Sequence, residues 1–126
     1  MMELHYALEG GNTHLLEPCG GFKKNSYLMA SPDQFVLQPL ERRFHKMKLF
    51  VTLPDGVLAF VTGFPFLPEI KVHAQLHTPE MYNCEILLDI ENLSQTEQIT
   101  IEEGFVIGEL ILSNPYDHIS IVQYDR

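Results

Sequence analysis

The histidines and cysteines of this 126-residue chain are the side chains whose chemistry must be placed first. There are six histidines and two cysteines. His73 and His77 are four residues apart in the sequence. On a continuous strand their side chains would therefore point to the same face, about 13 Å apart. One zinc ion, with Zn–N bonds of about 2.0–2.1 Å, does not span that distance. A turn near 78–79 would bring the rings closer, but the spacing itself predicts no metal site.

Nucleophilic catalysis needs an activated side chain with a base within hydrogen-bond reach. The chain has no G-x-S-x-G elbow, and neither Cys19 nor Cys84 belongs to a C-x-x-C pair. Cys84 falls on an apolar strand face, where a small buried thiol is the usual occupant. The glycine pairs at 10–11 and 20–21 lack the Lys-Ser/Thr of a phosphate-binding loop. These patterns indicate neither a nucleophilic enzyme nor a P-loop protein.

The elements that would position any site are short strands, because apolar side chains recur with a period of two between turn residues. We expect strands at 3–8, 25–30, 35–38, 45–53, 57–62, 69–76, 84–91, 98–101, 105–112 and 118–124. In 69–76, Ile70, Val72, Ala74 and Leu76 share the face that should be buried. No ten residues keep a helical period. The pattern predicts an all-β sandwich or jelly-roll-like barrel.

Composition limits the classes of partner. A chain of 126 residues with 45% hydrophobic side chains predicts a single domain over 1–126. A net charge of -9, from 17 acidic and 8 basic residues, disfavours nucleic acid. We interpret the basic cluster at 42–48 as a solvated strand edge rather than a site for nucleic acid or anionic lipid. No membrane span or leader is visible, so we expect a soluble, intracellular protein.

Several segments, in order, resemble the conserved blocks of the deoxyuridine triphosphatases (dUTPases). Residues 92–112 contain N-L-S and then G-x-x-I-G-x-L-I-L, similar to the fourth block, and 82–86 (YNCEI) resemble the end of the third block, D-Y-x-G-E-I. The passage over 35–54 resembles the family's strand, Pro-led turn and long strand. The resemblance covers about 22–113 of the chain. It implies a dUTPase-like β domain and a homotrimer, with the apolar faces of 69–76 or 105–112 at the contact.

The residues that the resemblance places at the active site differ from those that hydrolysis needs. The family's chemistry uses an Asp to activate water, Asp and Gln side chains to organise magnesium and phosphates, and an Arg-Ser-Gly clamp. The former active-site positions hold Leu28, Pro79, Met81, Tyr82, Phe105, Val106 and Glu109. At the position of the clamp, residues 62–68 have the sequence TGFPFLP. We do not expect the glycine-rich C-terminal arm with which the family covers its nucleotide. The resemblance therefore implies no catalytic residue, no metal, no cofactor and no enzyme activity.

Within the superfamily, the sequence is similar to a short, catalytically inactive viral branch, the early region 4 first-reading-frame proteins of adenoviruses. That resemblance implies an early viral adaptor in the host-cell cytoplasm or nucleus. Its partners would be host signalling proteins, including the phosphoinositide lipid kinase pathway. PDZ binding is not expected, because the charged terminal Arg126 does not fit a PDZ pocket.

The segment at the clamp position is the candidate partner-binding site. It consists of Phe64, Pro65, Phe66 and Leu67. These side chains would form either an exposed aromatic anchor or a plug that fills the vacant pocket. Two other functions remain open. One is an active or nucleotide-binding dUTP pyrophosphatase that uses Glu85, Asp89 or Glu109, and the other is an unrelated β-sandwich with a structural or capsid-associated role.

Overall fold

The structure, a computed structural model, describes residues 2–20, 25–64, 68–78, 82–113 and 119–124. All regular elements in these ranges are strands. They are β1 (Met2–Leu8), β2 (Glu17–Pro18), β3 (Ser26–Ala30), β4 (Phe35–Leu37), β5 (Arg42–Thr52), β6 (Leu58–Gly63), β7 (Ile70–His73), β8 (Gln75–His77), β9 (Cys84–Asn92), β10 (Ile99–Ile101), β11 (Val106–Ser113) and β12 (Ile119–Gln123). Within the same ranges, no helix has the length and hydropathy needed to cross a bilayer.

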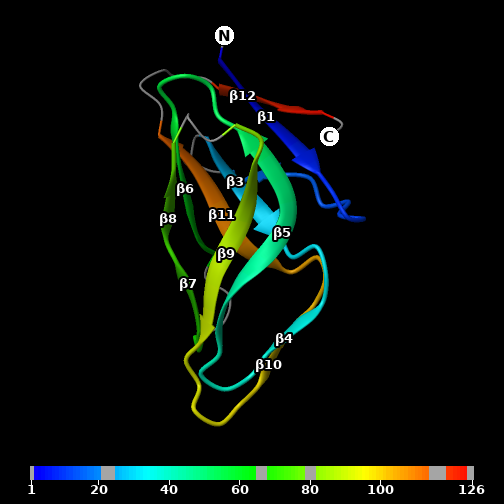
Figure 1. The fold of residues 1–126 in the computed structure, drawn as a ribbon, viewed down its shortest axis with the longest axis vertical. Coiled ribbons are helices and arrows are strands. Elements are labelled where there is room, and N and C mark those ends of the chain that lie inside the picture. The colour runs from blue at the N-terminus through cyan, green and yellow to red at the C-terminus, as the bar shows by residue number, and fades with distance from the viewer. Residues whose placement is uncertain (1, 21–24, 65–67, 79–81, 114–118, 125–126) are drawn as a thin grey trace.

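The strands form two layers. One five-stranded sheet has the order β12-β1-β5-β9-β7, and the other has the order β2-β3-β11-β6-β8. Figure 1 shows β5 and β9 lying over β3 and β11, with the small β10-β4 sheet extending from one end. The all-β sandwich is confirmed, and each expected strand has a counterpart. The two-residue strand β2 was not expected, because the pair Glu17–Pro18 is too short to show a period.

The core fills the space between the two sheets, as the alternating pattern predicts. On β9, Ile86, Leu88 and Ile90 are fully buried. They face Ile107 and Leu110 of β11, which are also fully buried. The apolar face of 105–112 is therefore turned into the chain's own core, so the prediction that it contacts another subunit is wrong.

The chain changes sheets in the middle of the segment expected to be one strand. β7 pairs with β9 in the first sheet, whereas β8 pairs with β6 in the second. A strand that turns from one sheet to another changes which side chains face the core. Leu76, predicted to be buried, is 52% exposed, and His77 takes the buried position instead.

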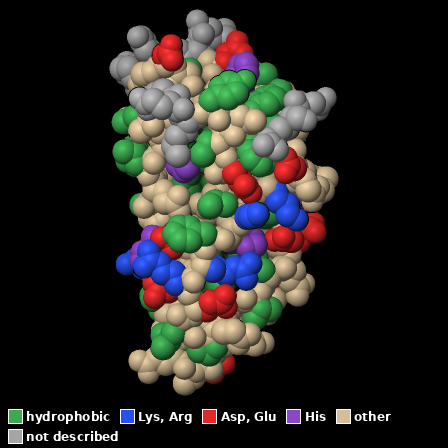
Figure 2. Space-filling view, viewed as in Figure 1, with side chains coloured by type: hydrophobic (Ala, Val, Ile, Leu, Met, Phe, Trp, Pro, Cys, Tyr) green, Lys and Arg blue, Asp and Glu red, His purple; other side chains and the backbone are tan. Residues whose placement is uncertain are grey.

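The basic cluster at 42–48 lies on the part of β5 that, among the described strands, pairs with β9 alone, because the pairing of β5 with β1 covers only 49–52. This agrees with its interpretation as a strand edge. Arg42 donates two hydrogen bonds to the Asp89 carboxylate, at 2.8 and 2.7 Å. Lys48 Nζ lies 3.4 Å from the Asp33 carboxylate. Figure 2 shows lysine and arginine side chains interleaved with acidic ones on this face, which explains why the cluster is not a uniformly basic patch.

Asn92, the first residue of N-L-S, joins three segments by its side chain. Its amide nitrogen lies 3.3 Å from the carbonyl oxygen of Leu37, 3.1 Å from that of Gln38 and 2.8 Å from that of Glu97. Its carbonyl oxygen accepts the amide hydrogen of Ser94 at 3.0 Å. The side chain is fully buried. It thus ties the end of β9 to the end of β4 and to the loop that leads into β10.

We expect the substitution Asn92→Asp to lower the free energy of unfolding by about 3 kcal/mol or more, because a buried carboxylate cannot donate to three carbonyl oxygens. Chemical denaturation measures the change. The matched control is Gln95→Glu, which introduces the same charge at an exposed position of the same loop and should change stability by less than about 0.5 kcal/mol. Equal effects of the two substitutions would contradict this role for Asn92.

Two glycines mark close approaches within the sandwich. A Cβ atom at Gly63 would lie 2.8 Å from Val72 Cβ, and one at Gly108 would lie 2.8 Å from Met29 Cε. The methionine methyl ends a flexible side chain and can move, whereas Val72 Cβ is fixed to its backbone. The two positions therefore differ in how well they can accept a larger residue.

We expect Gly63→Ala to destabilise the fold by about 1–3 kcal/mol, the usual cost of overpacking. Gly108→Ala should cost less, because Met29 can change rotamer. Urea denaturation of both variants against the natural chain tests the order. A larger loss for Gly108→Ala than for Gly63→Ala would show that the contact with Val72 is not the tighter constraint.

Candidate functional site

The outer face of the second sheet brings together three of the former active-site positions. β3 and β11 pair with Leu28 opposite Glu109, and Val106 lies opposite Ala30. Paired residues share one face of a sheet. The neighbouring Leu110 and Met29 point into the core, so Leu28 and Glu109 point away from it. The family resemblance implies that Leu28, Val106 and Glu109 belong to one site. The strand register places them near one another on β3 and β11.

A cavity of about 270 Å³ lies on this face. Its lining residues are Thr13, His14, Leu15, Glu17, Leu28, Ala30, Gly104 and Val106. One wall is the segment between β1 and β2. Asn12 fixes this segment, because its side-chain nitrogen donates to Met47 O at 3.1 Å and its side-chain oxygen accepts from His14 N at 2.9 Å. The sequence analysis did not predict this wall. Its only local signal is Asn12, which follows the glycine pair at 10–11.

The cavity has an apolar floor and an acidic rim. The floor consists of Leu28, Ala30 and Val106. Glu17 lines it, and His14 Nε2 lies 3.3 Å from the carboxylate of Glu103 at its edge. Among the described residues that line the cavity, none is a lysine or an arginine. Phosphoryl groups are held by cations and aligned N–H donors, and these described side chains include no permanent cation.

Glu109 does not line the cavity. It is buried, and its carboxylate accepts a hydrogen bond from the hydroxyl of Ser26. The other carboxylates considered for a residual hydrolase, Glu85 and Asp89, lie on β9 in the opposite sheet. Hydrogen bonds from Arg42 hold the pKa of the Asp89 carboxyl below its usual value. The three carboxylates are therefore not brought together into one site.

The remaining former active-site positions are dispersed or lie outside the described residues. Tyr82 is 81% exposed, just before β9, and Phe105 is 43% exposed at the turn before β11. Phe64 is partly buried, and its amide donates to Ile107 O at 3.2 Å. Outside the described ranges lie Pro79, Met81, Pro65, Phe66 and Leu67. The choice between an aromatic anchor and a plug at 64–67 thus stays open.

The two histidines weighed as metal ligands lie in different sheets. His73 Nε2 is 2.9 Å from the Glu91 carboxylate, on the outer face of the first sheet. His77 is buried in the second sheet, and its ring nitrogens have no hydrogen-bond partner in the described part of the chain. Burial lowers the pKa of its imidazole. Among the described residues, no three histidine, cysteine or carboxylate side chains are close enough to hold a metal ion.

Comparison with solved structures identifies the fold. The dUTPase of Staphylococcus bacteriophage 80alpha matches with a TM-score of 0.77 and 17% identity, over 90% of both chains. A mutant dUTPase from phage phi11 of S. aureus matches with a TM-score of 0.78 and 16% identity, over 90% of this chain and 91% of that one. No protein-family model matches the sequence, and neither does any curated protein.

These matches overturn the predicted function. The 80alpha enzyme is described as one of the phage dUTPases that control transfer of virulence genes by a proto-oncogenic G protein-like mechanism, and the phi11 enzyme as coordinating a structural Mg(II) ion. The prediction of an inactive adaptor for host signalling proteins is therefore wrong. The match extends over nine-tenths of the chain. This chain has the dUTPase fold.

Proposed function

We propose that this chain is a ligand-binding domain on the dUTPase fold that does not hydrolyse dUTP. The observation that carries the proposal is the cavity on β3 and β11. At the positions where the family holds phosphates, its floor is Leu28, Ala30 and Val106, and Glu17 supplies the charge. Such a lining suits a neutral or positively charged group with an apolar body. It repels a triphosphate, which carries several negative charges.

The chain's place in an inactive viral branch of the superfamily is part of this proposal. It is supported by the substitutions at the family's carboxylate and arginine positions, above all Leu28, Phe105 and Val106. It is also supported by the separation of Glu109 from Asp89 and Glu85, which lie in the other sheet. Without a positioned carboxylate, neither a water nor a magnesium ion can be oriented for attack on a phosphate.

We expect the purified protein to release no pyrophosphate from dUTP in the presence of magnesium. The reason is that the described lining of the cavity contains no lysine or arginine, and that the resemblance places Pro79 at the position of the water-activating carboxylate. A phage dUTPase in a parallel reaction shows that the assay detects turnover. The proposal would be overturned by pyrophosphate release that copurifies with the chain through a second column and is abolished by Glu109→Gln. That result would assign Glu109 a catalytic role.

Binding of dUTP is tested separately from its hydrolysis. A ligand at about 100 times its dissociation constant adds about 2.7 kcal/mol to the free energy of unfolding. We expect millimolar dUTP to leave the melting temperature unchanged, with and without magnesium. Leu28→Ala is the matched control variant: it enlarges the cavity floor without adding charge, so it too should show no response. A raised melting temperature for the natural chain would show that the cavity still binds nucleotide.

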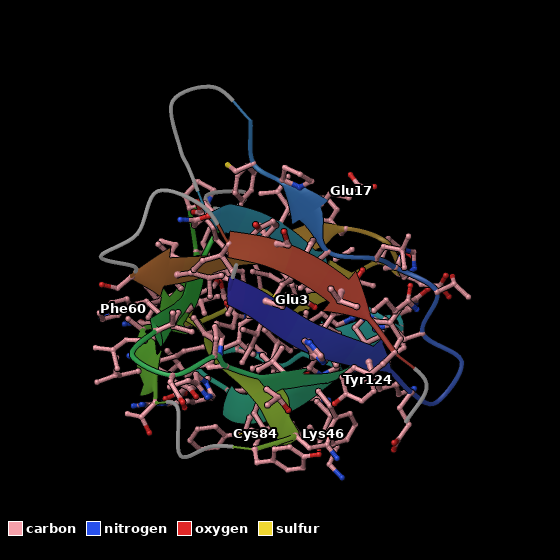
Figure 3. The ribbon with its side chains drawn as sticks, turned by 90° about the horizontal axis from the view of Figure 1, so that it is seen from above. Glu3, Glu17, Lys46, Phe60, Cys84 and Tyr124 are labelled. Carbon is pink, nitrogen blue, oxygen red and sulfur yellow. The ribbon has the colours of Figure 1, made fainter. Side chains whose placement is uncertain are left out.

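We also propose a homotrimer, which is the assembly that the family resemblance implies. The contact would use outer apolar residues of the second sheet, of which Leu76 belongs to the predicted segment 69–76 and Ile111 to the predicted segment 105–112. Leu76 lies opposite Phe60, which lies opposite Ile111, across three adjacent strands. Phe60 is 39% exposed, and Figure 3 shows it on the outside of the molecule, well away from Tyr124. An exposed apolar row of this kind is suited to burial between subunits.

Light scattering should give a mass of about three times the 14.5 kDa of the chain. Phe60→Glu should shift this mass to that of the monomer, because it places a charge in the apolar contact. The control Phe44→Glu changes an equally aromatic, exposed residue on the other sheet and should leave the mass unchanged. A monomer for the natural chain at high micromolar concentration would contradict the trimer.

A further inference from the structure

A second cavity lies beside the pairing of β1 with β12, near the end of β12. Its volume is about 270 Å³, and it is lined by His5, Thr52, Tyr82 and Tyr124. His5 and Thr52 are neighbours in the pairing of β1 with β5. Figure 3 shows Tyr124 just past the end of β12, where that strand runs beside β1. The cavity is thus built from four segments that are distant in the sequence, and it is separate from the cavity on β3 and β11.

Three of the four lining side chains are aromatic rings. The ring centroids of His5 and Tyr124 are 6.1 Å apart, and the planes are inclined by 51°. Tyr82 is the most exposed large apolar side chain of the described residues, at 81%. The face of an aromatic ring carries negative electrostatic potential, which attracts a cation within about 6 Å.

Hydrogen bonds hold the walls of this cavity before any ligand is present. Tyr124 donates its hydroxyl hydrogen to the side-chain oxygen of Asn83 at 2.8 Å, and the backbone amide of Asn83 donates to the Thr52 hydroxyl at 2.8 Å. The backbone amide of Tyr124 donates to Tyr6 O at 2.9 Å. Asn83 has a φ of 50°, the left-handed conformation that asparagine tolerates. A preorganised site loses little conformational freedom on binding.

The charges around the cavity favour a cation and disfavour an anion. Among the described residues that line it, none is a lysine or an arginine. A Glu3 carboxylate oxygen lies 3.3 Å from His5 Nε2 at the rim, and the whole chain carries a net charge of -9. The resulting field raises the local concentration of positively charged ligands.

We propose that the cavity formed by His5, Thr52, Tyr82 and Tyr124 binds an organic ammonium group, of the methylated or quaternary kind. Such a group has an apolar surface that fits between aromatic rings and a spread positive charge that the ring faces attract. It needs no hydrogen-bond acceptor, which agrees with a lining in which the Tyr124 and Thr52 hydroxyls are engaged with Asn83. The site is independent of the cavity on β3 and β11, so it stands whether or not that cavity binds a ligand.

The first test compares two ligands of the same shape and different charge. Choline and its neutral isostere 3,3-dimethylbutan-1-ol are titrated into the full chain while NMR follows the tyrosine ring signals. We expect saturable shifts of the Tyr82 and Tyr124 rings with choline. The alcohol should bind about 2- to 30-fold more weakly, which is the range that one cation–π contact contributes. Equal binding of both ligands, or no saturable shift with choline, would overturn the proposal.

The second test uses variants of the exposed Tyr82, which can be changed without disturbing the core. Tyr82→Phe keeps the ring and should keep choline binding, whereas Tyr82→Leu removes the ring and should weaken it to the level of the alcohol. Phe44→Leu removes an exposed ring near the other end of β5 from Thr52 and is the control that should change nothing. Unchanged binding by Tyr82→Leu, or tighter binding of uracil than of choline, would assign the cavity to another kind of ligand and reject the ammonium site.

Discussion

The contact between Gly63 and Val72 sets how closely the two sheets approach each other at one side of the sandwich. Gly63 ends β6 in the second sheet, and Val72 lies on β7 in the first. Two residues after Val72 the chain leaves the first sheet and joins the second as β8. A side chain at Gly63 would push these strands apart at the point where one of them must cross. The approach therefore determines both the path of the chain and the side chains that β8 can bury.

Once the layers are fixed, the outer face of the second sheet keeps its geometry whatever residues it carries. The register that pairs Leu28 with Glu109 depends on backbone hydrogen bonds and on inward residues such as Leu110. The outward residues are free to change without loss of the core. This separation explains how a chain can share 16% or 17% identity with phage dUTPases and still match them with TM-scores of 0.76–0.78. The scaffold depends on one face of each strand, and the chemistry depends on the other.

The sequence was sufficient to predict the strands, because burial of one face imposes a period of two, which β9 keeps from Ile86 to Ile90 and which β11 keeps after the register shift between Val106 and Gly108. It was also sufficient to bring Leu28, Val106 and Glu109 to one site, through their order in the family's blocks. It could not reveal the crossing at Ala74, since both halves of 69–76 keep the same alternation across the bend. Nor could it reveal the wall formed by Thr13 and His14, or the meeting of Tyr82 with Tyr124. Those contacts join residues far apart in the chain, and no local pattern encodes them.

The crossing at Ala74 also has a consequence for the behaviour of the chain in acid. It places His77 in an apolar interior where its ring nitrogens have no partner among the described residues, and burial lowers the pKa of this imidazole below its ordinary value of 6.5. An unfolded chain takes up a proton on this residue at a pH where the folded chain does not. As the pH falls below about 6.5, proton uptake therefore favours unfolding, and the contribution of His77 to stability is regained only as the pH rises again. The contribution of His77 alone therefore makes the folded chain less stable in mild acid than at neutral pH.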